Sequence, residues 1–241
     1  MVRLTVADGI GTITLADPQS ANALGEPMVV ALQDTFETIG TAADVRAVVL
    51  RGEGDVFSSG APRELLLRLA AGELRPADIV LPRLLFECEV PIVAAMAGHA
   101  TGGGFALGLA ADIVVIGRES RYGFTFMNLG FTPGMGTTKL CEYVLSPAVA
   151  HELLYTGELR RGANFAGTGV NHVVPRHEVE SVAFDIAARI AGQPRSSIAV
   201  LKRTLSLPRR QAFEQSITHE SLMHQITFAA AAGRIRDTYV E

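Results

Sequence analysis

The sequence has little cysteine, no concentration of basic residues and no long apolar run. Only Cys88 and Cys141 occur among 241 residues, both in apolar surroundings, which fits buried thiols in a reducing compartment better than a disulfide framework. The formal net charge of −4, with no basic face, argues against nucleic acid as a partner. No uninterrupted apolar run reaches the ~18 residues of a membrane-spanning helix. The N-terminal stretch MVRLTVADGIGTITL alternates apolar and polar residues and lacks the apolar core of a signal peptide. We therefore expect a cytoplasmic protein without a membrane segment.

Apolar patterns predict strands that alternate with helices through most of the chain. Val2–Val6 and Ile10–Leu15 alternate like strands around the turn ADG, which indicates a hairpin. Glu26 to Ile39 places its apolar residues on one helical face. The stretches VRAVVLRG, VPIVAAMAG and ADIVVIG are short and almost entirely apolar, as strands inside a parallel sheet are. This order predicts an α/β protein with right-handed parallel connections.

The last part of the chain has helical periodicity. Helices are predicted at Val179–Ala191, Ser196–Leu205 and Arg209–Ala231, with breaks at GQPR and LPRR. No linker is long enough to separate independent domains. The predicted organisation is an α/β core over residues 1–190 and a helical region over residues 191–241.

Three consecutive glycines, Gly102–Gly104, precede an apolar helix in AMAGHATGGGFALGLAADIVV. The spacing matches neither G-x-G-x-x-G nor G-x-x-x-x-G-K-[ST], so phosphate binding has weak support. Close packing of strand against helix is one explanation. The other is an oxyanion hole, in which a glycine N–H faces an oxygen that gains charge. A second joint of strand, small residues and helix, DVFSSGAPRELLLRL, could supply the second donor.

The motifs FSSGA after VVLRG, then PIVAAMAGHATGGGFALGLAADIVV, then GFTPGMGTT resemble the crotonase (enoyl-CoA hydratase/isomerase) superfamily over nearly the whole chain. The resemblance implies a ββα-spiral core with C-terminal helices that assemble a homotrimer or a hexamer. It also implies that two backbone N–H groups hold a thioester carbonyl and stabilise an enolate. By motif position these donors fall on Ala61 and Gly103.

Hydratases of this superfamily carry two glutamates that handle water, and neither is present here. Their motif positions hold Ala106 and Phe126. Loss of a general acid or base typically costs roughly 10²–10⁴-fold in rate. We therefore do not expect a hydratase.

Further segments, CEVPIVAAMAGHATGGG, ESRYGFTFMNLGFTPGMGTT, LLYTGELRRG and HESLMHQITF, resemble the decarboxylating crotonases of polyketide β-branching. This implies conversion of a 3-methylglutaconyl thioester to a 3-methylcrotonyl thioester with loss of CO2. The substrate would be carried on the phosphopantetheine of an acyl carrier protein, or on CoA, with no other cofactor. Phe124, Phe126, Met127 and Phe131 could provide apolar surroundings for the substrate carboxylate.

The proton donors of that subgroup match only in part. Its histidine, in an E-x-x-M-H pattern, corresponds to His224, whereas Leu65 and Leu69 occupy the positions of its lysine and tyrosine. Arg63 and Arg68 are the basic residues of the same helix and could bind a carboxylate. The catalytic residues are thus predicted as Ala61, Gly103 and His224, and the substrate-binding residues as Arg63, Leu65, Arg68, Leu69, Phe126 and Phe131.

Two alternatives stay open: a double-bond isomerase of the same fold, and a crotonase-like subunit that binds carrier protein without catalysis. The intact oxyanion motifs favour an enzyme. His99 is expected to stabilise a loop or to pack. No His, Cys, Asp or Glu cluster has metal-ligand spacing, so no metal is predicted.

Overall fold

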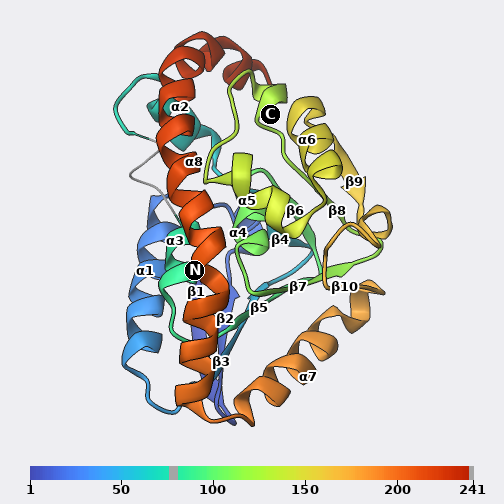
Figure 1. Ribbon diagram of the computed structural model, residues 1–241. Helices are drawn as coiled ribbons and strands as arrows, with labels where there is room; N and C mark the ends of the chain where they lie inside the picture. The colour runs from blue at the N-terminus through green and yellow to red at the C-terminus, as the bar shows by residue number, and fades with distance from the viewer. Residues whose placement is uncertain (76–80, 239–241) are drawn as a thin grey trace.

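The computed structural model describes residues 1–75 and 81–238 (Figure 1). It begins with the predicted hairpin of β1 (Val2–Ala7) and β2 (Ile10–Leu15), which pair antiparallel. The two turn residues, Asp8 and Gly9, both have positive φ, at 52° and 79°. This conformation suits the right-handed twist of a two-residue hairpin and explains the Asp-Gly pair.

Two sheets form the core of the molecule. The larger has the strand order β1-β2-β3-β5-β7-β10, and every pair after the hairpin is parallel. Its remaining strands are β3 (Ala47–Gly52), β5 (Ile92–Met96), β7 (Ile113–Gly117) and β10 (His172–Val174). The smaller sheet has the order β4-β6-β8-β9, with bounds Val56–Ser58, His99–Thr101, Arg121–Gly123 and Leu159–Arg161. The prediction of an α/β protein with a parallel sheet is confirmed.

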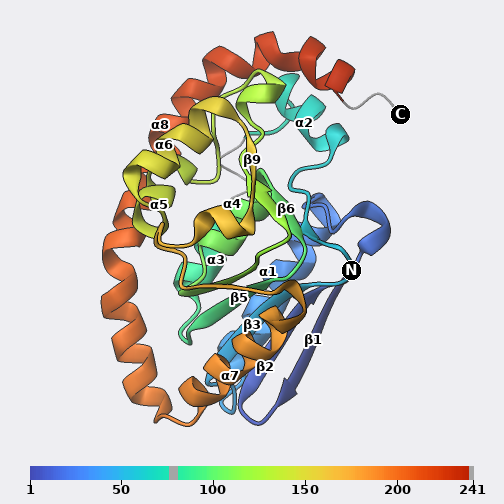
Figure 2. The same cartoon turned by 90° about the vertical axis from the view of Figure 1, so that its right-hand side faces the viewer.

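The central strands are apolar on both faces because both faces of the large sheet are covered. Val48 and Leu50 of β3 point into a large cluster shared with the helices at 26–41, 81–87 and 103–109, whereas Ala47 and Val49 pack in a second cluster with the helix at 179–191. Figure 2 shows α7 (Val179–Ala191) crossing one face of this sheet. The other helices before α8 are α1 (Glu26–Thr41), α2 (Arg63–Ala70), α3 (Leu81–Glu87), α4 (Gly103–Leu109), α5 (Thr137–Val144) and α6 (Pro147–Thr156). Short 3-10 segments lie at Pro18–Ser20, Met127–Leu129, Gly162–Phe165 and Arg176–Glu178.

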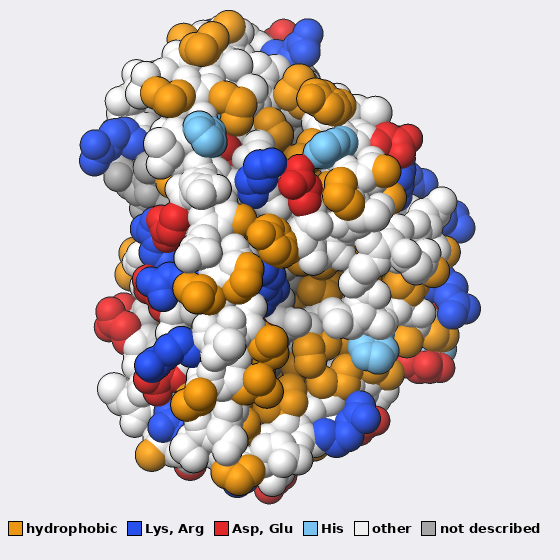
Figure 3. All heavy atoms as spheres, viewed as in Figure 1, with side chains coloured by type: hydrophobic (Ala, Val, Ile, Leu, Met, Phe, Trp, Pro, Cys, Tyr) orange, Lys and Arg blue, Asp and Glu red, His pale blue; other side chains and the backbone are white. Residues whose placement is uncertain are grey.

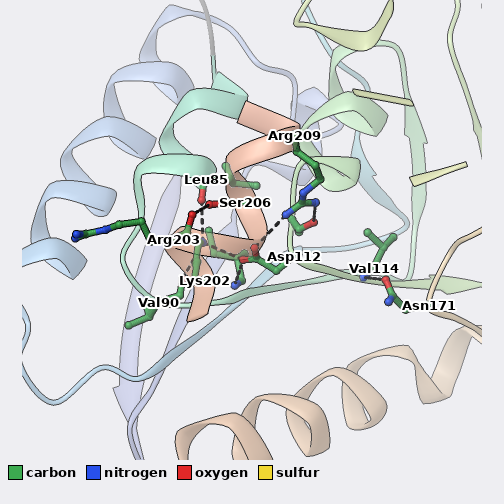
Figure 4. A network of polar contacts seen from close by, with 11 residues as sticks. Leu85, Val90, Asp112, Val114, Asn171, Lys202, Arg203, Ser206 and Arg209 are labelled. Atoms are coloured by element: carbon green, nitrogen blue, oxygen red, sulfur yellow. Dashed lines mark hydrogen bonds and ion pairs between the residues drawn. The ribbon is translucent and has the colours of Figure 1, made fainter. Parts of the chain in front are cut away.

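The predicted break at LPRR is wrong, because α8 runs unbroken from Arg195 to Thr238 with Pro208 inside it. Polar contacts hold the helix on both sides of the proline, with Lys202 buried and Asp112 and Arg209 half-buried (Figure 4). Lys202 Nζ lies 2.9 Å from Asp112 Oδ2, and Arg209 Nη2 lies 3.1 Å from Oδ1 of the same carboxylate. A proline removes one helical hydrogen bond, and these long-range contacts keep the neighbouring turns in place.

The C-terminal half of α8 curves over α2, as both ribbon views show. The predicted boundary between residues 190 and 191 falls at the end of α7, and the division into two regions stays a prediction. No helix within the described ranges is long and apolar enough to cross a membrane.

Candidate active site

The ends of β4 and β6 bring the two small-residue joints together. These strands are parallel neighbours in the smaller sheet, so the loops that follow them leave from the same edge. Gly60 has a φ of 81°, and a Cβ on it would lie 2.9 Å from the backbone nitrogen of Gly103. Only glycine permits this approach. The loop that carries Ala61 therefore lies directly against the start of α4.

The backbone N–H groups of Ala61 and Gly103 have no hydrogen-bond partner in the part of the chain that the structure describes. The neighbouring N–H of Gly102, in contrast, donates to the carbonyl of Gly123 over 2.9 Å. Gly104 packs so closely that a Cβ would collide with the carbonyl oxygen of Ser58. Both explanations of the triplet thus have geometric support: Gly104 allows close packing, and Gly103 leaves a free donor.

A cavity of about 80 Å³ lies beside these two donors. No charged side chain lines it within residues 1–75 and 81–238, and its polar side chains are Ser59, Thr125 and His224. The predicted site residues that line it are Ala61, Leu65, Leu69, Gly103, Phe126, Phe131 and His224. The arrangement can hold an apolar acyl chain with its thioester oxygen near two N–H donors.

Arg63 and Arg68 could bind the substrate carboxylate only if their side chains pointed into the cavity. The structure does not show this orientation. Neither arginine lines the cavity. The Arg68 guanidinium forms an ion pair with Glu26 at 2.6 Å and a longer one with Glu73, and these acidic partners raise its pKa. Arg63 Nη2 points toward the far end of α8, 3.5 Å from the carbonyl oxygen of Arg236. Solvent-exposed carboxylates and a carbonyl are better partners for these cations than a small apolar cavity.

Two of the four residues expected to surround the substrate carboxylate lie elsewhere. Phe124 is fully buried behind the cavity wall and stacks on Phe126, with ring centroids 5.9 Å apart. Met127 is 39% exposed and does not line the cavity. Phe126 and Phe131 form the wall as expected.

His224 is the polar side chain of most chemical interest in the cavity. It is 5% exposed, and its Nε2 lies 3.0 Å from the carbonyl oxygen of Thr132. A carbonyl only accepts, so Nε2 carries the proton and donates it. The buried Nδ1 has no hydrogen-bond partner. Burial lowers the pKa of this imidazole. In the neutral imidazole, Nδ1 therefore carries a lone pair. In the imidazolium, Nδ1 carries a proton.

Further lining residues were absent from the sequence prediction. Phe228 stacks on Phe131 with centroids 4.5 Å apart, and it lies one helical turn after His224, a spacing that could have placed it on the same face. Met135 also lines the cavity, with a φ of 61°. Its position between two glycines is the sequence signal for an unusual backbone. The others are Leu24, Ser59, Leu66, Leu81, Gly102, Thr125, Leu129 and Gly134.

The two hydratase positions hold no acid or base in the structure. Ala106 is fully buried within α4, and Phe126 is part of the cavity wall. His99 has the predicted loop-stabilising role, because its Nδ1 accepts the backbone N–H of Arg121 at 2.9 Å. Over the described residues, no group of three or more His, Cys, Asp or Glu side chains is placed to hold a metal ion.

Comparison with known proteins finds chains similar to this one in sequence and in structure. The enoyl-CoA hydratase/isomerase family model matches residues 5–241. The bacillaene synthase decarboxylase PksI of Bacillus subtilis is 38% identical over 226 residues, which cover 93% of this chain and 91% of that protein.

Two solved structures are also similar. One belongs to a dehydratase/decarboxylase enzyme couple involved in polyketide β-branching, with a TM-score of 0.95, 37% identity, and coverage of 99% of this chain and 96% of that one. The other is the ECH2 decarboxylase domain of CurF from Lyngbya majuscula, with a TM-score of 0.93, 38% identity and coverage of 99% of both chains.

Proposed function

Because the chain belongs to the enoyl-CoA hydratase/isomerase family, the crotonases, we propose that it decarboxylates a 3-methylglutaconyl-type thioester in polyketide β-branching. The expectation of a crotonase-fold lyase rather than a hydratase is confirmed by its decarboxylase relatives. The observation that carries the proposal is a cavity with two free backbone donors, one histidine and no charged side chain among the described residues that line it.

The electron sink is the thioester itself. When the bond to CO2 breaks, its electron pair passes through the conjugated chain to the thioester oxygen and leaves a dienolate. The N–H groups of Ala61 and Gly103 donate hydrogen bonds to that oxygen, and these hydrogen bonds become stronger as the negative charge on the oxygen grows. Loss of one donor of this kind typically costs ~3–4 kcal/mol of barrier. No metal or further cofactor is needed to accept these electrons.

The apolar wall favours loss of CO2. A carboxylate beside Phe126 and Phe131 loses much of its hydration and meets no lysine or arginine in the described lining. Its departure as neutral CO2 removes the charge from that wall and moves it to the oxyanion donors. This explains how the site can work although both nearby arginines point away from it.

His224 then returns a proton to the γ-carbon and gives the 3-methylcrotonyl product. For this step Nδ1 must hold a second ring proton, and the approaching substrate carboxylate favours that cationic form. The leucines at positions 65 and 69 provide no proton, which leaves this histidine as the titratable side chain of the described lining.

We propose that an acyl carrier protein presents the substrate on its phosphopantetheine and that the enzyme works as a homotrimer or hexamer in the cytoplasm. Isomerisation of a double bond is the second candidate. It is favoured by one observation, the unpartnered Nδ1 of His224, which could remove a proton from carbon. A non-catalytic subunit has no comparable support.

The test is incubation with 3-methylglutaconyl thioester on carrier protein and, separately, on CoA. Intact mass spectrometry is expected to show loss of one CO2 per acyl chain, faster on the carrier protein. Crotonyl-CoA is the control, and its hydration should be undetectable because Ala106 and Phe126 move no proton. If the product keeps its carboxyl group and the double bond has moved, the result contradicts decarboxylation and supports isomerisation. Rapid hydration would contradict the assignment of the two positions.

A further inference from the structure

Glu220 is a buried carboxylate that the proposed reaction does not use. It is 2% exposed and lies on the side of α8 that faces the start of α5. Its Oε2 accepts the backbone N–H of Gly136 at 2.7 Å, and its Oε1 accepts the N–H and the hydroxyl of Thr138 at 3.0 and 2.8 Å. Every partner is a donor in these contacts. The arrangement therefore suits an ionised carboxylate, which only accepts.

The segment 132–138 is fixed from α8 at both ends. Glu220 binds its C-terminal end, and His224, one helical turn further, binds the carbonyl of Thr132 at its N-terminal end. Thr227 adds a contact of its hydroxyl to that of Thr132 at 3.2 Å. The segment therefore follows the position of one face of α8.

Met135 stands in the middle of this segment. Its φ of 61° lies in a region that non-glycine residues rarely adopt, so the surrounding contacts must maintain it. Its sulfur packs against Gly103, where an added Cβ would lie only 2.7 Å from Sδ. The position of Met135 thus determines the space in front of one oxyanion donor.

We propose that Glu220 is a positioning residue: its carboxylate holds Gly136 and Thr138, and thereby keeps Met135 against Gly103 and the Thr132 carbonyl on His224. The expected effect of Glu220 on the reaction rate rests on the proposed function, whereas its expected effect on the position of Met135 rests on the geometry alone.

The pKa of the Glu220 carboxyl lies close to neutral pH. Burial raises its pKa to about 7, and the hydrogen bonds from Gly136 and Thr138 oppose this rise. The titratable groups near it in the described chain are the Cys141 thiol on α5, whose pKa is raised in part by this carboxylate, and His224 on α8. Acidification protonates Glu220, removes acceptor capacity and loosens the 136–138 end of the segment.

The test compares Glu220→Gln with Glu214→Gln, a matched change on the same helix at an exposed residue paired with Arg83. Glu220→Gln is expected to lower kcat for decarboxylation on the order of tenfold to hundredfold, because small misplacements of reacting groups have effects of that size. KM should change little, and the decline of rate on the acid side should disappear. Glu214→Gln should behave as the parent.

A second readout does not depend on catalysis. The chain has six methionines, and ¹³C-methyl labelling gives each a separate NMR signal, with that of Met135 assigned through Met135→Leu. In the parent the Met135 methyl signal should titrate near pH 7 with Glu220, and in Glu220→Gln it should be displaced and independent of pH. If the parent releases no CO2, the proposed function fails while this titration still tests Glu220.

Thr138→Val serves if Glu220→Gln does not fold, because it removes one donor and leaves the carboxylate. It should move the titration midpoint of the Met135 signal to higher pH and lower kcat. Parent-like kcat and a parent-like Met135 signal in the folded variant would overturn the inference.

Discussion

His224 offers a different function at each ring nitrogen. Nε2 donates to the Thr132 carbonyl, whereas Nδ1 is buried and has no hydrogen-bond partner among the described residues. The backbone contact fixes the ring and its tautomer, so the chemistry falls to Nδ1. At this scale the charge state of one imidazole decides whether the dienolate receives its proton.

Replacement of His224 by alanine should separate the two halves of the reaction. CO2 release depends on the oxyanion donors and should persist, whereas proton delivery to the γ-carbon should slow roughly 10²–10⁴-fold as expected for a lost general acid. Measuring CO2 together with deuterium incorporation from D2O checks this. If both steps run at the parent rate, His224 takes no part in proton transfer.

The pH profile should carry the signature of the same residue. Burial lowers the pKa of His224 below its usual 6.5, so the protonated, donating form declines as the pH rises through that lowered value. The fraction of His224 that can donate a proton should fall by about tenfold per pH unit above it. Glu220, whose pKa burial raises to about 7, must be ionised at the same time, so the parent profile is expected to rise on the acid side, level off between the two pKa values and fall above about pH 7. In His224→Ala the alkaline decline should vanish, and its persistence would assign that limb to another group.

Among the elements, α8 depends on a charge cluster on either side of Pro208, in which Lys202 is buried and Asp112 and Arg209 are half-buried. Lys202 is 4% exposed and donates to the carbonyls of Leu85 and Val90 and to Asp112. Arg209 shares the same carboxylate. The cluster joins the helix to the core near the start of β5, since Asp112 also accepts the N–H of Ile92. The helix that carries Glu220 and His224 is thereby anchored far from the cavity.

Lys202→Met should destabilise the protein by about 3–5 kcal/mol, because removal of one partner leaves buried acceptors and part of a carboxylate charge uncompensated. Urea denaturation at fixed protein concentration measures the change. Arg83→Met is the control, since its pair with Glu214 is largely exposed and should contribute about 0–1 kcal/mol. Equal effects of the two substitutions would show that the cluster contributes no more than a surface pair.

At the scale of the whole molecule, an apolar hollow between α7 and the first half of α8 is a candidate interface between copies of the chain. Apolar side chains gather in the hollow between them (Figure 3), lined in part by Ile186, Ile190, Ile198, Leu201 and Leu205. Leu201 and Leu205 are 58% and 66% exposed on the isolated chain. Contiguous apolar surface of this kind commonly marks an interface between proteins.

We expect a trimer or a multiple of it in solution. Multi-angle light scattering at micromolar concentration should give such a mass, and Leu205→Glu should reduce it because a charge in an apolar interface lacks a partner. Glu substitution of exposed Tyr155 on α6, away from the hollow, is the control. A monodisperse parent monomer would refute the assembly.

The sequence by itself determined what depends on local backbone geometry and on apolar period. The hairpin follows from Asp8-Gly9, the strands covered on both faces from unbroken apolar runs, and the meeting of Ala61 with Gly103 from small residues at two equivalent joints. These features need only neighbouring residues and a parallel order of strands. The motifs that resemble the decarboxylating crotonases could also be read from the sequence, because each consists of neighbouring residues.

Only the tertiary structure decided where long side chains point and whether α8 continues. Arg68 turns outward because Glu26, far away in the sequence, offers a carboxylate, and Pro208 stays within a helix because Asp112 holds both sides of it. The free Nδ1 of His224 likewise depends on the distant Thr132 carbonyl. Such contacts join residues that no local pattern relates, and their energies outweigh the local preferences of single residues.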